Sequence, residues 1–143
     1  MIRLSLPWSV LAQANHRLIP RKNGRGLTLT REYREAKERA RLLVASQTRR
    51  DPVLIGPVEV RLRFWMPDHK RRDPDNLLKL IHDAMSGIVY HDDHQIRRQV
   101  WEVAGVDRVD PRVEIEVEPL RAADHERDRK STRLNSSHKV QSR

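Results

Sequence analysis

The sequence contains no cysteine, and its 143 residues include only one phenylalanine and five glycines. The missing cysteine excludes a disulfide scaffold, a thiolate zinc site and a cysteine nucleophile. No apolar run approaches the roughly 18 residues that a membrane-spanning helix needs, so we expect no such helix in this protein. Hydrophobic residues make up 37% and aromatic residues 4% of the chain. These shares predict one modest core in a single domain.

The N-terminus only weakly imitates a signal peptide. An A-x-A triplet, Ala12 to Ala14, follows the mixed stretch Leu4 to Leu11. Pro7 interrupts that stretch and only Arg3 precedes it, which is unlike the apolar centre and basic start of an export signal. We therefore expect a cytoplasmic protein.

Positive charge is in excess, with 29 Lys and Arg against 20 Asp and Glu and a net charge of +9. Of this, +4 lies in residues 128–143, and we expect residues 121–143 to be a disordered basic tail behind a folded domain over residues 1–120. The stretch Asp128 to His138 resembles the translation of a sequencing-library adapter, which would make the tail from about residue 128 an assembly artefact and leave the native C-terminus missing. The alternative is a natural basic tail that contacts nucleic acid.

Hydrophobic spacing predicts the secondary structure. Alternating apolar residues predict strands over residues 2–6, 58–66, 95–104 and 113–117 and a short one over 26–29, with a bulge between Val100 and Trp101. Helical spacing predicts helices over 31–47, after an N-cap at Thr30, and over 75–87, while Asn15 to Arg25 is expected to be a polar loop. The order predicts an α+β domain, with a mostly antiparallel or mixed sheet packed against two main helices.

The densest unusual chemistry is the run Lys70 to Asn76, which reads K-R-R-D-P-D-N. Asp73 precedes a proline and is expected to be extended, so that Asp73 and Asp75 point the same way. Paired carboxylates repel each other unless a cation intervenes, and Mg²⁺ prefers such oxygen ligands. The alternative is that Asp75 merely caps the following helix.

Lys79 and Asp83 follow Asp75 at intervals of four residues, so the three share one helix face. Lys79 in this position could orient a water molecule or neutralise charge that develops on a phosphate. The alternative is an ordinary surface ion pair between Lys79 and either aspartate.

A second acidic cluster, His91-Asp92-Asp93-His94, precedes the strand predicted from residue 95. A helix that returns to the sheet could bring Asp93 to Asp73 and Asp75 and complete a three-carboxylate metal site. The alternatives are a solvated turn, or a zinc site on His91 and His94 that lacks an obvious third ligand.

Basic residues flank both acidic clusters. Lys70, Arg71 and Arg72 precede the first, and Arg97 and Arg98 follow the second. A carboxylate centre inside a cationic rim suits a nuclease, because cations bind the phosphate backbone while a metal serves the chemistry. A basic surface without function remains open as the alternative.

These residues resemble the RusA family of Holliday junction resolvases, small dimeric endonucleases often carried by prophages. The resemblance rests on R-R-D-P-D-N at Arg71 to Asn76, on Lys79, and on G-I-V-Y-H-D-D-H-Q-I from Gly87 to Ile96. It implies that Asp73, Asp75 and Asp93 are metal-binding catalytic carboxylates.

The resemblance also implies that Lys79 is an assisting catalytic lysine. It implies orienting roles for three further residues, Asn76, Asp83 and Asp92. The substrate it implies is a four-way DNA junction, cut on two strands by a symmetric homodimer with Mg²⁺, for which Mn²⁺ can substitute, in DNA recombination and repair.

Two other functions stay open at this point. An HD-type phosphohydrolase is suggested by His69, His82-Asp83 and a later aspartate. That fold is all-helical, so the predicted strands argue against this alternative. A basic module that binds nucleic acid without cutting it would use its acids only for helix caps and ion pairs.

Overall fold

The computed structural model describes residues 1–12, 18–72 and 74–121 of the chain. Its helices and strands are β1 (Ile2–Pro7), α1 (Trp8–Leu11), β2 (Leu18–Pro20), β3 (Leu27–Leu29), α2 (Arg31–Gln47), β4 (Val58–Met66), α3 (Asp75–Met85), the 3-10 turn η2 (Asp93–Gln95), β5 (Ile96–Val106) and β6 (Arg112–Pro119). The predicted α+β class is confirmed. None of the described helices is long and apolar enough to span a membrane.

Four strands form one mixed sheet in the order β1-β6-β4-β5. β6 is antiparallel to both of its neighbours, whereas β4 and β5 are parallel. Parallel neighbours need a crossover connection, and here α3 provides it. The acidic residues of interest therefore lie on or beside this crossover.

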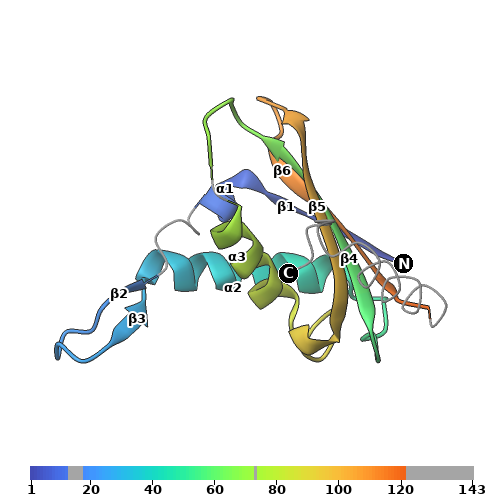
Figure 1. Ribbon diagram of the computed structural model, residues 1–143, viewed down its shortest axis with the longest axis horizontal. Coiled ribbons are helices and arrows are strands. Elements are labelled where there is room, and N and C mark those ends of the chain that lie inside the picture. Colours follow the sequence, from blue (N-terminus) through green and yellow to red (C-terminus); the bar gives the residue numbers. More distant parts are fainter. Residues whose placement is uncertain (13–17, 73, 122–143) are drawn as a thin grey trace, which may run out of the picture.

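α2 and α3 cover one face of the sheet (Figure 1). The alternating apolar residues of β1, β4 and β6 point to this face and are buried, as the period of two predicts. From α2, Tyr33, Ala36, Ala40 and Val44 complete the core at helical spacing. The core is a single cluster between the sheet and the two helices.

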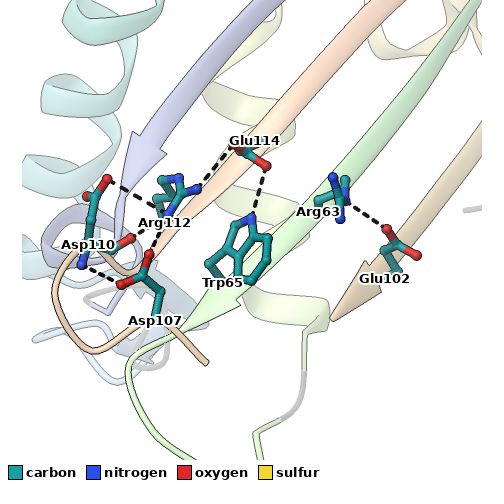
Figure 2. A network of polar contacts seen from close by, with 7 residues as sticks. All are labelled: Arg63, Trp65, Glu102, Asp107, Asp110, Arg112 and Glu114. Carbon is teal, nitrogen blue, oxygen red and sulfur yellow. Dashed lines mark hydrogen bonds and ion pairs between the residues drawn. The ribbon is translucent and has the colours of Figure 1, made fainter. Parts of the chain in front are cut away.

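The opposite face of the sheet carries charged side chains in alternating sign (Figure 2). Arg63 pairs with Glu102 at 2.9 Å, and the indole Nε1 of Trp65 donates to Glu114 at 2.9 Å. Arg112 pairs with Glu114 at 3.3 Å and with Asp107 at 3.0 Å, and its guanidinium lies 5.3 Å from the Trp65 ring centroid. These pairs, of which Arg63–Glu102 and Trp65–Glu114 join neighbouring strands, stabilise the outer face, and they occupy arginines that composition alone would assign to DNA binding.

Several sequence predictions are confirmed and three need correction. The helix over 31–47 has the predicted bounds, and Thr30 caps it by accepting from Tyr33 N at 3.1 Å. The helix from Asp75 ends at Met85, two residues early, and Gly87 follows with φ 84°. The loop expected over Asn15 to Arg25 contains strand β2. The pairing register of β4 with β5 shifts at two places, where Arg97 and Ala104 of β5 have no partner on β4. Val100 and Trp101, where the bulge was expected, pair in continuous register.

Candidate active site

α3 begins with the first candidate carboxylate. Asp73 lies outside the described residues, Pro74 occupies the N-cap position, and Asp75 is the first helical residue and is exposed. Among the described residues no side chain caps this helix, and the N-cap position belongs to Pro74, so the alternative that Asp75 serves as the cap is wrong. A carboxylate in the first turn is still favoured by the positive end of the helix dipole. Asn76 follows and is half-buried.

Lys79 and Asp83 form the ion pair that their spacing predicts. Lys79 Nζ lies 3.5 Å from Asp83 Oδ1, and 48% of the lysine side chain is exposed against 23% of the aspartate. The other carboxylate oxygen of Asp83 accepts the hydroxyl hydrogen of Tyr33 at 2.6 Å. Tyr33 belongs to α2 and is fully buried, so the lysine is linked to a fixed point in the core.

Arg41 holds the same end of α3 against α2. Its Nη1 donates to the carbonyl oxygens of Asp83 at 2.9 Å and Ser86 at 2.7 Å. The last carbonyl groups of a helix lack partners within the helix, and a cation there also complements the dipole. The backbone of Asp83 and its side chain are thus both fixed by α2.

The second acidic cluster folds as a tight turn before β5. Asp92 is the N-cap of η2 and accepts from His94 N at 3.0 Å. The backbone N–H of His94, followed by a hydrogen bond with Asp93, lowers the pKa of Asp92. Asp93 is the first residue of η2 and is exposed. Asp92 therefore shapes the turn, and Asp93 is presented to solvent.

Gln95 fixes this turn to the body of the domain. Its Oε1 accepts from the backbone N–H of His91 at 2.7 Å and of Asp92 at 3.0 Å. Its Nε2 donates to the carbonyl oxygens of Leu54 and Gly56, both at 2.9 Å. All four bonds use the side-chain amide, so Gln95 ties the turn that contains Asp93 to the segment around Leu54 and Gly56.

Buried polar groups lie between this turn and α3. His82 Nε2 bonds Gln99 Oε1 of β5, and burial lowers the pKa of His82 despite this bond. Burial, and then the negative charges of Asp93 and Asp83, raise the pKa of Tyr90, whose hydroxyl bonds no described group. The negative charge of Asp93 thus acts on the pKa of both His82 and Tyr90.

The predicted three-carboxylate site lies partly outside the described residues. Asp75 lies two helical turns, about 12 Å along the axis, from Asp83, with Lys79 between them. Within residues 1–12, 18–72 and 74–121, no three His, Asp or Glu side chains are placed to hold a metal ion. Asp73, one of the three predicted ligands, is outside that set. The donor chemistry fits Mg²⁺, because Asp75 and Asp93 are exposed carboxylates.

The predicted DNA-binding cations divide into two groups. Lys70 and Arg71 are exposed, make no ion pair in the described structure, and line an open hollow beside the end of β5. Arg72 binds both oxygens of Asp68, at 2.6 and 3.0 Å, and lies 5.0 Å from the Trp8 ring centroid. Arg97 is exposed and Arg98 is half-buried at the other end of β5. The cations therefore lie near both ends of this strand instead of forming one ring.

The contacts of three residues in this arrangement were not predicted from the sequence. Apart from one capping-box spacing, the sequence gives no sign of a polar partner for Tyr33, and no sign of a role for Gln95 or Gln99. The Asp92-x-x-Gln95 spacing of a capping box could have identified Gln95. Nothing local could have paired Tyr33 with Asp83 or Gln99 with His82, because these residues come from separate elements. The mixed sheet excludes the HD-type alternative, which requires an all-helical fold.

Most of this chain matches the model of a known protein family. The family model of the endodeoxyribonuclease RusA matches residues 7–118. No curated protein matches the chain. The matched region contains both acidic clusters, Lys79 and the whole crossover from β4 to β5. Because it covers most of the 143 residues, the chain belongs to the RusA family of endodeoxyribonucleases.

Proposed function

We propose that this protein is a Mg²⁺-dependent endonuclease that resolves four-way DNA junctions by paired phosphodiester hydrolysis in recombination and repair. Family membership supports endonuclease chemistry on DNA. The observation that carries the proposal is the exposed face of α3, where Lys79 stands one turn from Asp75 and is paired with Asp83. A lysine fixed beside an exposed carboxylate suits a reaction in which a phosphate gains negative charge.

In this proposal Asp73, Asp75 and Asp93 hold the metal ion, for which Mn²⁺ can substitute. When bound, such an ion supplies Lewis acidity and a more acidic water to phosphodiester hydrolysis. Lys79 offers its ammonium group to the scissile phosphate, and Asp83 keeps that group on the exposed side of α3. Asp92 and Gln95 hold the turn that presents Asp93.

Cutting a junction on two opposing strands requires two active sites. One chain carries one set of the candidate residues, so we propose that the protein acts as a symmetric homodimer. Lys70, Arg71 and Arg97 are exposed cations that could bind the phosphate backbone of the DNA arms.

The test compares cleavage and binding of the same DNA. Purified protein is incubated with a labelled four-way junction and with linear duplex of the same sequence, in Mg²⁺ and in EDTA. We expect paired nicks in the junction only, and only with the metal. Asp75→Asn should abolish cleavage and retain junction binding, whereas Asp51→Asn, the same change at an exposed residue outside the site, should preserve both.

The basic-module alternative makes the opposite prediction. If the acids serve only as caps and ion pairs, Asp75→Asn leaves DNA binding unchanged or slightly tighter, and the wild-type protein cuts nothing in any divalent ion. That result would overturn the endonuclease proposal. Calorimetric titration of Mg²⁺ into wild type and Asp93→Asn tests the metal site without relying on activity.

A further inference from the structure

A two-stranded arm projects from the body of the domain. β2 and β3 pair with each other and with no other described strand, in the register Leu18 with Leu29, Ile19 with Thr28 and Pro20 with Leu27. The arm leaves the N-terminal end of α2 and extends away from the four-stranded sheet (Figure 1). Every residue from 18 to 27 is exposed, so this segment contributes nothing to the core.

The tip of the arm carries charge of one sign. The residues that connect the two strands are Arg21, Lys22, Asn23, Gly24, Arg25 and Gly26. All three charged residues among them are cations, residues 18–30 include no acid, and none of these cations forms an ion pair in the described structure. This differs from the outer face of the sheet, where arginines are matched by glutamates.

The backbone of the tip is held in one shape. Gly24 and Gly26 have φ of 73° and 75°, a conformation that side chains with a Cβ disfavour. Arg21 N donates to Gly26 O at 3.0 Å, Gly24 N donates to Arg21 O at 3.0 Å, and Arg25 N donates to Asn23 Oδ1 at 2.9 Å. A tip with fixed backbone presents its cations at lower entropic cost than a flexible loop would.

The base of the arm is connected to the candidate active site. β3 ends at Leu29, the next residue Thr30 caps α2, and Tyr33 in the first turn of α2 bonds Asp83 at 2.6 Å. Asp83 in turn pairs with Lys79. A ligand held by the arm is thus held by an element that is anchored beside Lys79.

From these observations we infer that the β2–β3 arm is a DNA-binding element. The cations at its tip, Arg21, Lys22 and Arg25, bind the phosphate backbone of one DNA branch next to the active site. The inference rests on the proposed function for its choice of DNA as the polyanion. An unmatched cluster of three cations on an exposed, preformed turn is complementary to a phosphate backbone. These cations are additional to Lys70, Arg71 and Arg97.

The test measures binding and its salt dependence in EDTA, where cleavage does not interfere. The triple variant Arg21→Gln/Lys22→Gln/Arg25→Gln is compared with Arg49→Gln/Arg50→Gln/Arg108→Gln, which removes the same charge from exposed residues elsewhere. Affinity for a labelled four-way junction is measured by fluorescence anisotropy from about 50 to 200 mM KCl. Circular dichroism and urea unfolding verify that both variants remain folded.

We expect the arm variant to bind roughly ten- to a hundred-fold more weakly at the lower salt concentration, with the slope of log affinity against log salt reduced by about 2 to 3. The control variant should stay within about three-fold of wild type, because its cations contact no phosphate directly. The arm variant should cut at the wild-type single-turnover rate once protein saturates the DNA. This separates it from Asp75→Asn, which should bind and not cut.

Three results would overturn the inference. The first is equal affinity and slope in the arm and control variants. The second is a change of oligomeric state in the arm variant by light scattering that accounts for its weaker binding, which would make the arm a subunit contact. The third is wild-type protein that binds no DNA. Wild-type protein that binds DNA through the arm and cuts nothing would overturn the proposed endonuclease function and leave the arm inference standing.

Discussion

The hydroxyl group of Tyr33 lies 2.6 Å from Oδ2 of Asp83, and this bond joins the buried face of α2 to the exposed face of α3. Asp83 uses its other oxygen for Lys79, at 3.5 Å. A long lysine side chain that is half exposed has many rotamers, and an oriented carboxylate restricts them. We therefore predict that Tyr33 is a positioning residue, which acts on Lys79 through Asp83.

Tyr33→Phe should slow cleavage more than it weakens binding. The substitution keeps the buried ring and removes only the hydroxyl, so Asp83 loses its fixed partner. We expect a loss of about 1.5 to 3 kcal/mol in the free energy of unfolding, the range for a hydrogen bond to a charged group. The single-turnover rate at saturating protein should fall roughly ten-fold, with junction affinity unchanged.

Tyr90→Phe is the matched control for that prediction. Tyr90 is also fully buried, but its hydroxyl bonds no described group. Removing it should leave the free energy of unfolding within about 0.5 kcal/mol of wild type, or raise it slightly, because no hydrogen bond is lost. Equal losses of stability and rate in Tyr33→Phe and Tyr90→Phe would contradict the positioning role of Tyr33.

Gln95→Glu should damage the second acidic turn although it changes only one group. The carboxylate can still accept from His91 N and Asp92 N, but it cannot donate to the carbonyl oxygens of Leu54 and Gly56. Two lost donors and a carboxylate facing carbonyl oxygens should cost about 2 kcal/mol. Urea unfolding measures this loss, and cleavage should fall while junction binding persists.

His94→Ala supplies the comparison, since His94 is exposed on the same turn. This variant should unfold at the wild-type urea concentration and cut at the wild-type rate. If it and Gln95→Glu behave alike, the four amide bonds of Gln95 do not hold Asp93 in place.

The stability of the protein should fall on mild acidification because of His82. Burial lowers the pKa of His82 from its ordinary value of 6.5 in the folded state. The unfolded chain therefore binds more protons as the pH falls below 6.5, and each such proton favours unfolding. The contribution of His82 is complete above this pH and is lost as the pH falls toward the lowered folded-state pKa.

Urea unfolding of wild type and His82→Gln between about pH 7.5 and 5.5 tests this, because a glutamine can still donate to Gln99 but does not titrate. The variant should lose less stability on acidification than wild type does. His94→Gln makes the same substitution at an exposed position and serves as the matched control. A steeper fall in His82→Gln would show that the sign is wrong.

The hydrophobic pattern of the sequence predicted the elements whose bounds depend on the burial of one face. The alternation in β4 and the helical spacing in α2 gave those elements their observed bounds, since both follow from burial of one face. The arm strand β2 was missed because its three residues are exposed and include a proline, so they show no alternation against a core. Its pairing with β3 is set by the turn between them instead.

The candidate site was predictable in its residue types and only partly in its contacts. Asp75, Lys79 and Asp83 were correctly placed on one face because helical spacing is fixed. The bond of Gln95 to Leu54 and Gly56 joins segments far apart in the chain, and no short-range signal encodes it. Whether Asp73 joins Asp75 and Asp93 stays a prediction, because Asp73 lies outside the described residues.

Arg71 and Arg72 are adjacent and chemically identical, yet the structure separates their roles. Arg72 forms a two-point ion pair with Asp68 and stacks against Trp8, with 19% of its side chain exposed. The same hydrogen bonds from Arg72 lower the pKa of Asp68. Arg71 is exposed and forms no ion pair within the described part of the chain.

We therefore expect opposite effects from the same substitution at these two positions. Arg72→Gln should lower the free energy of unfolding by about 1 to 2 kcal/mol, because a partly buried two-point pair and a cation–π contact are lost together. Arg71→Gln should leave stability within about 0.5 kcal/mol of wild type and reduce the salt slope of junction binding by about 1, the value for one phosphate contact. Urea unfolding and anisotropy titrations of both variants decide the matter: a larger change in salt slope for Arg72→Gln than for Arg71→Gln would mean that Arg72 leaves Asp68 to bind DNA.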